Sequence, residues 1–189
     1  MIELEKKESI YHLCMNAGEN RWNTTFVRQF AEALDEIEKD EGPGALVTSS
    51  KDPKFFSNGL DLEWMQKPED YPESGDREVF GEEFMYLMGR IITLPIPSIC
   101  VVNGHAFGAG FMLALSHDIR LMREDRGFLC ANEMQLGFKI PRPELLYLDI
   151  KFLRIHFLRP FNYPNDGLGK LLLQLELFRA KVRLKNYLR

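Results

Sequence analysis

An α/β fold is predicted by two features of the sequence. Short runs of β-branched and other apolar residues alternate with longer segments in which apolar residues recur every three or four positions, as on one face of a helix. Glycine-rich turns follow several of the β-rich runs, at points where a strand would give way to a helix. Strands that alternate with helices in this way indicate an α/β fold.

The first elements are a strand and a helix. Residues 10–15 are a predicted strand that ends at the turn 16–18. Thr24 or Thr25 is expected to cap the helix that follows, whose apolar positions fit the 3.6-residue period: Phe26, Phe30, Ala33, Leu34 and Ile37. A Gly-Pro-Gly turn ends this helix, and residues 45–48 form a short buried strand.

The middle of the chain is predicted to be richer in loops. Residues 51–59 are expected to be a loop, 60–65 a helical turn, and the polar, Pro-rich stretch 67–76 a mobile surface loop. A second amphipathic helix follows, marked by Phe80, Phe84, Leu87, Met88 and Ile91. Two prolines, Pro95 and Pro97, end it.

After these prolines the alternation resumes. Residues 98–102 are a β-rich run that turns at Asn103-Gly104. The sequence Gly108-Ala109-Gly110 leads into an apolar helix over 111–115, and two further strands are predicted at 119–122 and 127–130. Beyond Pro141 the pattern changes, because residues 145–158 are apolar without one clean period.

Composition and charge exclude several classes of protein. The 189 residues are 45% hydrophobic and 28% charged, which is ordinary for a globular protein. The longest apolar runs fall short of the ~18 residues of a membrane span, and the first residues lack the apolar core of a signal peptide. A net charge of −4 gives no attraction for nucleic acid. Three cysteines without metal-ligand spacing predict buried thiols in a reducing compartment, and no metal site.

The charge is distributed unevenly. Residues 142–189 hold ten Lys/Arg and four Asp/Glu, a net of +6, so residues 1–141 carry −10. We therefore expect two parts, a core over 1–141 and a divergent basic tail over 142–189. In the tail, apolar residues at helical spacing predict an amphipathic helix over 168–185: Leu168, Leu171, Leu175, Phe178 and Val182.

Three glycine-containing stretches are candidates for chemistry, namely 55–62, 102–112 and 132–137. In each, glycine stands where a strand ends and a helix or turn begins. Such positions let backbone N–H groups point into a cleft instead of a hydrogen-bonded ladder. Two N–H groups from separate loops can form an oxyanion hole. Each turn alone is equally consistent with a plain structural turn.

Taken together, the three stretches resemble the crotonase family, the enoyl-CoA hydratase/isomerase superfamily. The specific part is Asn-Gly-His-Ala-x-Gly-x-Gly at 103–110, followed by Ala-Leu-Ser-His-Asp-Ile-Arg at 114–120, and the likeness covers roughly residues 8–141. The resemblance implies a spiral of stacked β-β-α turns. It also implies that the backbone N–H groups of Leu60 and Ala109 hold the thioester oxygen of an acyl-CoA as it becomes an enolate.

The resemblance also implies the acid–base chemistry. Family hydratases use two glutamates, and the two positions are Met112 and Glu133 in this sequence. One carboxylate suffices to move a proton along an allyl system, so Glu133 is expected to shuttle a proton in a Δ3,Δ2-enoyl-CoA isomerase, most like the plant peroxisomal type. Apolar neighbours would raise its pKa. The expected substrate-binding residues are Ser57, Asn58, Gly59, Gly108 and Met112.

Other readings stay open. A different acyl-CoA reaction of the superfamily, hydration or thioester hydrolysis, is one alternative, although a thioether at Met112 argues against hydration. Another is a catalytically weak, truncated subunit that only binds acyl-CoA or full-length partners. The resemblance implies no metal or redox cofactor, because CoA arrives with the substrate, and it implies a homo-oligomer, a trimer in the family.

The tail bears on both activity and localisation. From about Leu145 the sequence no longer matches the family, so the segment is a divergent tail or a splice or gene-model product. The resemblance implies a peroxisomal location in fatty-acid β-oxidation. The chain ends in Tyr187-Leu188-Arg189 and not in a Ser-Lys-Leu-type signal, and a cytoplasmic location is the alternative.

Three polar residues near the glycine stretches are expected to be structural. His105 flanks a glycine turn, Asp118 is a hydrogen-bond acceptor between a helix and a strand, and Asp61 caps the turn after the first loop. Ser57 and Ser98 lack a Gly-x-Ser-x-Gly elbow, which argues against a serine hydrolase.

Overall fold

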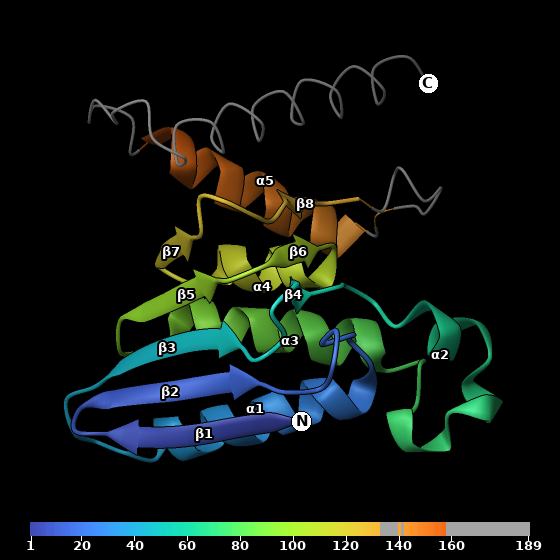
Figure 1. Cartoon of the computed structure of the whole chain (residues 1–189), viewed down its shortest axis with the longest axis horizontal. Coiled ribbons are helices and arrows are strands. Elements are labelled where there is room, and N and C mark those ends of the chain that lie inside the picture. The colour runs from blue at the N-terminus through green and yellow to red at the C-terminus, as the bar shows by residue number, and fades with distance from the viewer. Residues whose placement is uncertain (133–139, 141, 158–189) are drawn as a thin grey trace. The chain divides into compact units, whose positions relative to one another are not determined.

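A computed structural model describes residues 1–132, 140 and 142–157, with only the backbone of 152–157. The chain divides into two units, Met1–Ile140 and Pro141–Arg189. The first unit contains two sheets and the helices between them (Figure 1). The described part of the second unit is one helix, α5 (Arg142–Phe157). The predicted tail helix over 168–185 lies outside the described residues.

The first unit is a succession of similar turns that pass through two sheets. Three times in order, a strand of a five-stranded sheet is followed by a strand of a three-stranded sheet. The pairs are β3 (Ala45–Ser50) with β4 (Phe55–Ser57), β5 (Ser98–Val102) with β6 (His105–Phe107), and β7 (Ile119–Met122) with β8 (Leu129–Cys130). Helices connect successive pairs, so the chain winds as the predicted spiral of β-β-α turns.

The larger sheet has the order β1-β2-β3-β5-β7 and is parallel except at one edge. There, β1 (Ile2–Lys7) runs antiparallel to β2 (Ile10–Met15), with Ile2 opposite Met15. The smaller sheet has the order β4-β6-β8 and is parallel throughout. Both sheets therefore place the carboxyl ends of their parallel strands, and the loops that follow them, on one side.

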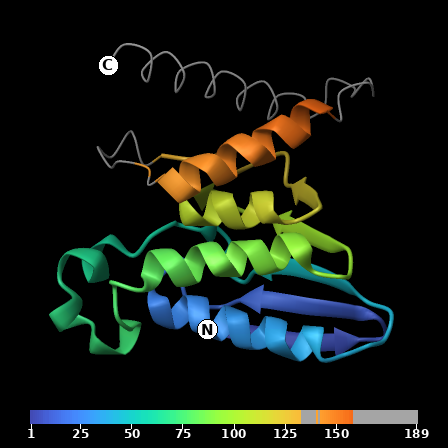
Figure 2. The ribbon, with the colours of Figure 1, turned by 180° about the vertical axis from the view of Figure 1, so that it is seen from behind.

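Three helices lie along one face of the larger sheet (Figures 1 and 2). They are α1 (Thr24–Glu38), α3 (Phe80–Thr93) and α4 (Ala109–Ser116). Helices α1 and α3 are amphipathic, whereas every residue of α4 is buried. The predicted apolar stripes of α1 and α3 form the core, in which Trp22 contacts the rings of Phe26, Phe30 and Phe84.

Several element boundaries differ from the sequence prediction. Asn23, and not Thr24 or Thr25, caps α1, because its side-chain oxygen accepts a hydrogen bond from Phe26 N–H (2.8 Å). The predicted loop 51–59 contains β4, and the residues directly after the predicted Asn103-Gly104 turn form β6. The segment after Pro141, whose apolar residues follow no single period in the sequence, contains the helix α5.

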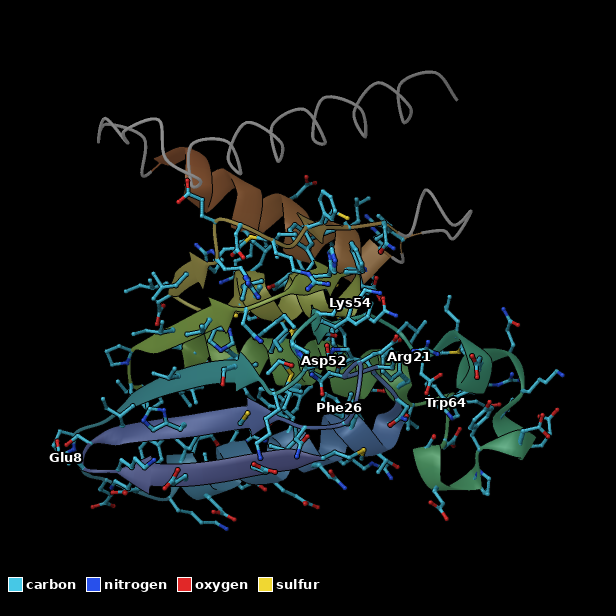
Figure 3. The ribbon with its side chains drawn as sticks, viewed as in Figure 1. Glu8, Arg21, Phe26, Asp52, Lys54 and Trp64 are labelled. Atoms are coloured by element: carbon cyan, nitrogen blue, oxygen red, sulfur yellow. The ribbon has the colours of Figure 1, made fainter. Side chains whose placement is uncertain are left out.

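The Pro-rich stretch is more ordered than a simple loop. After the short helix α2 (Leu62–Gln66), it forms two 3₁₀ turns, η1 (Pro68–Asp70) and η2 (Pro72–Ser74). The Trp64 indole donates to the carbonyl of Gly75 (3.0 Å), which ties α2 to the end of this stretch. The position of Trp64 is labelled in Figure 3.

The cysteines are only partly as predicted. Cys100 is buried, and burial raises the pKa of its thiol, whereas Cys14 and Cys130 are half-buried. Within the described residues, no group of three or more His, Cys, Asp or Glu side chains is placed to hold a metal ion. In the same part of the chain, no helix has the length and apolar character that a membrane span requires.

Candidate active site

The first predicted loop leaves the end of β4 in a conformation that depends on glycine. Gly59 has φ +83°, a value that residues with a β-carbon rarely adopt. The next residue, Leu60, forms an isolated parallel bridge to Trp22. Two hydrogen bonds make this bridge, from Trp22 N–H to the Gly59 carbonyl (2.8 Å) and from Asp61 N–H to the Trp22 carbonyl (2.9 Å). In a parallel bridge the residue between them keeps its own N–H on the opposite side.

The second loop leaves β6 and begins α4. Gly108 has φ +49° and stands immediately before the helix, and its N–H donates to the Cys130 carbonyl (3.1 Å). Ala109 is the first helical residue, so its N–H has no acceptor within the helix. The aligned peptide dipoles place partial positive charge at this end of α4. A developing negative charge near Ala109 would be stabilised.

Close backbone contact brings the two loops together. A β-carbon built on Gly59 would lie 2.9 Å from the Phe107 carbonyl oxygen and 3.8 Å from Gly108 Cα. One built on Gly110 would lie 2.6 Å from Ser57 Cβ. Both glycines are needed because the backbones approach more closely than side chains permit.

The two predicted oxyanion donors therefore lie on adjacent loops. Neither the Leu60 N–H nor the Ala109 N–H donates a hydrogen bond within the part of the chain that the structure describes. Paired donors that are free in this way, one of them at a helix N-terminus, are suited to bind an oxygen that acquires negative charge.

Ser57 and Asn58 make contacts inside the fold. The buried Ser57 hydroxyl accepts from the Trp22 indole Nε1–H (3.0 Å) and donates to the Asn20 carbonyl (2.8 Å). The Asn58 side chain donates to a Glu19 carboxylate oxygen (2.8 Å), and this bond is the main cause that lowers the pKa of Glu19. These contacts anchor the first loop to the segment before α1.

The remaining predicted site residues lie in and after α4. Met112 is buried in α4, with only 2% of its surface exposed. Glu133, the predicted proton shuttle, lies outside the described residues, and its pKa and neighbours stay predictions. The structure therefore brings together Gly59, Leu60, Gly108 and Ala109, with Ser57 packed directly behind them.

The residues expected to be structural have structural partners. Asp61 caps α2 by accepting from Trp64 N–H (3.3 Å), and Asp118 accepts from both the N–H and the hydroxyl of Ser98 (2.9 Å each). Both predictions are confirmed.

His105 lies in β6 and has aromatic neighbours. Its ring stacks on Phe107 (centroids 5.3 Å apart) and on Phe128 (5.4 Å). Burial, followed by the nearby charges of Arg126 and Lys54, lowers the pKa of His105, so the ring is neutral at pH 7.

Sequence reasoning missed the contribution of two residues, Asn20 and Trp22. Trp22 lies in the core, and its backbone and its indole both bind the first loop. Asn20 adopts φ +51° and donates to the Phe56 carbonyl (3.1 Å). These contacts join residues more than 30 positions apart, so no local pattern marks them. The neighbouring Arg21, labelled in Figure 3, pairs with Glu19 (2.8 Å) and reaches Glu63 of α2 (3.4 Å).

Comparison with known proteins gives a consistent set of matches. A family model described as enoyl-CoA hydratase/isomerase matches residues 5–146. Two curated relatives from Arabidopsis thaliana are enoyl-CoA delta isomerase 2, peroxisomal, at 34% identity over 143 residues, and enoyl-CoA delta isomerase 1, peroxisomal, at 38% over 144 residues. Each match covers 75% of this chain but only 60% and 58% of the relatives, so the chain spans less than two thirds of their length.

Solved structures share the fold. A probable enoyl-CoA hydratase from Mycobacterium tuberculosis superimposes with a TM-score of 0.71 at 23% identity, covering 90% of this chain and 71% of that one. A protein from Legionella pneumophila named putative enoyl CoA hydratase/isomerase (crotonase) gives a TM-score of 0.70 at 25% identity, covering 96% of this chain and 74% of that one. The spiral of two sheets and its connecting helices is thus shared with these proteins.

Proposed function

Because the chain belongs to the enoyl-CoA hydratase/isomerase family, we propose that it isomerises 3-enoyl-CoA thioesters to trans-2-enoyl-CoA thioesters. One observation carries the proposal: the N–H groups of Leu60 and Ala109, which donate no hydrogen bond within the described residues, lie on loops held in backbone contact. Two curated relatives that each match 75% of this chain are named enoyl-CoA delta isomerases, which supports this reaction over others of the family.

The oxyanion hole would stabilise the intermediate of the reaction. Removing a proton from C2 of a 3-enoyl thioester produces a dienolate, whose charge resides largely on the thioester oxygen. The two N–H groups, with the N-terminus of α4 behind Ala109, are fixed before the reaction begins. Donors that need no reorganisation stabilise developing charge more in the transition state than in the ground state.

One carboxylate would complete the proton transfer. In the proposal, the Glu133 carboxylate takes the proton from C2, the double bond shifts, and the same group returns the proton to C4. No atom is gained or lost, and no co-reactant is required. Hydration would need a second acid–base group to split water, and the α4 position that carries it in hydratases of the family is Met112, whose thioether cannot transfer a proton.

The direct test is an isomerase assay on the purified chain with a 3-enoyl-CoA substrate. Glu133→Gln is expected to reduce kcat by at least 10²-fold, the lower range for loss of a general base, while the affinity for saturated octanoyl-CoA changes little. Glu124→Gln is the matched control, because it removes a carboxylate from the loop before β8, and full activity is expected.

Three results would contradict the proposal. An active Glu133→Gln variant would remove that residue from the mechanism. A wild-type chain that binds octanoyl-CoA but does not isomerise 3-enoyl-CoA would show that the chain only binds acyl-CoA. Hydration of crotonyl-CoA at a rate comparable with isomerisation would overturn the one-carboxylate argument based on Met112.

A further inference from the structure

Trp22 holds the first loop from two sides. Its backbone N–H and carbonyl bond to Gly59 and Asp61, which flank Leu60, and its indole Nε1–H bonds to the hydroxyl of Ser57 (3.0 Å). One residue therefore fixes both the start and the end of the segment 57–61. The Leu60 N–H lies within this segment, between Gly59 and Asp61. Its direction therefore depends on both the backbone contacts and the indole contact of Trp22.

The hydroxyl of Ser57 has no capacity left for another partner. A serine hydroxyl donates one hydrogen bond and accepts two. Ser57 donates to the Asn20 carbonyl (2.8 Å) and accepts from Trp22 Nε1–H (3.0 Å) and, more weakly, from Gly59 N–H (3.3 Å). Its side chain is fully buried. The hydroxyl therefore holds the first loop in place.

The indole itself is held rigidly by aromatic neighbours. Trp22 has no exposed surface and meets Phe26 edge-on (4.9 Å between centroids) and Phe84 edge-on (5.1 Å). Helices α1 and α3 supply these rings, so the core of the first unit determines where the indole N–H points. A polar group with one defined orientation is an effective anchor for a loop.

We propose that the hydrogen bond from the Trp22 indole to the Ser57 hydroxyl aligns the Leu60 N–H in the oxyanion hole, and that Trp22 and Ser57 are positioning residues for the reaction. This inference rests on the proposed function for its kinetic readout. Neither side chain touches the substrate in this account. They act on the position and direction of one backbone N–H. Displacing such a group by 1 Å costs on the order of 10²-fold in rate.

Trp22→Phe and Ser57→Ala each remove one partner of the bond and keep most of the volume. We expect each to lower kcat by roughly 10- to 100-fold, as misplacement of one donor does, with KM changed less than about twofold because ground-state binding gains little from the hole. The double variant should cost no more than either single one, since both remove the same interaction.

Trp64→Phe is the matched control. Trp64 is also fully buried, and its indole also donates one hydrogen bond, to the Gly75 carbonyl (3.0 Å) and not to the first loop. The Trp64→Phe variant should lose about as much thermal stability as Trp22→Phe. Its kcat should stay within about twofold of wild type, because the change lies outside the reacting groups.

A second readout does not depend on turnover. Octanoyl-CoA labelled with ¹³C at its carbonyl is saturated and cannot isomerise, and its infrared carbonyl stretch moves to lower frequency when hydrogen bonds polarise the oxygen. When the ligand binds wild type, we expect the carbonyl frequency to fall clearly. The fall should be smaller with Trp22→Phe and with Ser57→Ala, and it should equal the wild-type value with Trp64→Phe. A thermal unfolding curve checks that each variant is folded. If Trp22→Phe does not fold, Ser57→Ala alone decides the outcome.

The outcomes separate this inference from the proposed function. If wild type is not an isomerase but the carbonyl shift still shrinks in both variants, the positioning role holds and the proposed reaction fails. If wild type is an isomerase and the folded variants keep its kcat and its carbonyl shift, the positioning role fails. A lower kcat with an unchanged shift, or losses that multiply in the double variant, would also overturn it.

Discussion

Gly59 and Phe107 are in backbone contact, and a β-carbon on Gly59 would lie only 2.9 Å from the Phe107 carbonyl oxygen. The obstructing atom belongs to the main chain of β6, so it cannot rotate away as a side chain would. Gly59 also has φ +83°. The distance between the two loops, and with it the distance between the Leu60 and Ala109 N–H groups, therefore depends on the absence of a side chain at position 59.

Gly59→Ala is predicted to weaken both the fold and the site. Strain at positive φ costs about 1–3 kcal/mol of unfolding free energy, and the clash forces the loops apart. We expect kcat to fall by about 10²-fold, as for the loss of one oxyanion donor. Urea unfolding and the isomerase assay measure the two effects.

Gly89→Ala provides the comparison for this variant. Gly89 lies within α3, and a β-carbon there would meet no atom within 4 Å. Alanine is favoured over glycine inside a helix by about 0.5–1 kcal/mol, so this variant should be slightly more stable and fully active. If Gly59→Ala behaved like Gly89→Ala, the contact with Phe107 would not determine the site.

The sequence identified the glycine turns but not the strands before them. Strands β4 and β6 have only three residues each, too few to display an alternating pattern, and β4 lies in a segment rich in loop-forming residues. Pairing with neighbouring strands makes them strands, and that pairing is non-local. By contrast, β1 alternates Ile2 and Leu4 with Glu3 and Glu5, a pattern that would have allowed its prediction.

The part of the predicted site that the structure describes lies at backbone positions beside glycines. Leu60 and Ala109 are implied by the family resemblance, and the glycines that precede them are visible in the sequence. The anchoring of these loops by Asn20, Trp22 and Ser57 depends on contacts between distant segments, which leave no local signal. The helix α5 was missed because apolar residues occur all around it, so it lacks the one-sided period that marks α1 and α3.

The aromatic contact between Trp22 and Phe84 predicts a large cost for truncation in α3. Phe84 is 1% exposed and lies 5.1 Å from Trp22 between ring centroids. Phe84→Ala should lower the unfolding free energy by about 3–5 kcal/mol and reduce kcat as well, because Trp22 loses a neighbour. Tyr86→Ala, two residues along the same helix at 71% exposure, should change stability by less than about 0.5 kcal/mol. Equal losses in the two variants would argue against this packing.

The imidazole of His105 is predicted to have a pKa below its ordinary value. Burial between Phe107 and Phe128 and the charges of Arg126 and Lys54 all lower the pKa of the imidazole. The unfolded chain therefore binds a proton at higher pH than the folded chain, and the group reduces stability as pH falls below about 6.5. Proton NMR of the histidine ring should give a midpoint below 6.5, assigned by the loss of its signal in His105→Asn. A midpoint at or above that value would contradict the stacked, partly buried environment.

Asp40 links β1, β2 and the end of α1, and its charge is expected to stabilise the fold in a defined pH range. Its carboxylate accepts from the Lys6 ammonium, the Tyr11 hydroxyl and Gly42 N–H, and these contacts hold the pKa of Asp40 far below its ordinary 3.8. A carboxylate with a depressed pKa in the folded state contributes stability that is present above its unfolded pKa and is lost as pH falls through that value toward the folded one. The contact with Asp40 also raises the pKa of Lys6, so the contribution to stability also fades as pH rises above about 10.4.

Asp40→Asn should therefore lower the urea midpoint between about pH 5 and 9, with a difference from wild type that shrinks below pH 4. Glu36→Gln, which removes an exposed carboxylate from α1, is the control and should leave the urea midpoint at pH 7 unchanged. A difference that stayed constant from pH 7 to pH 2 would show that Asp40 acts through its shape and not through its charge.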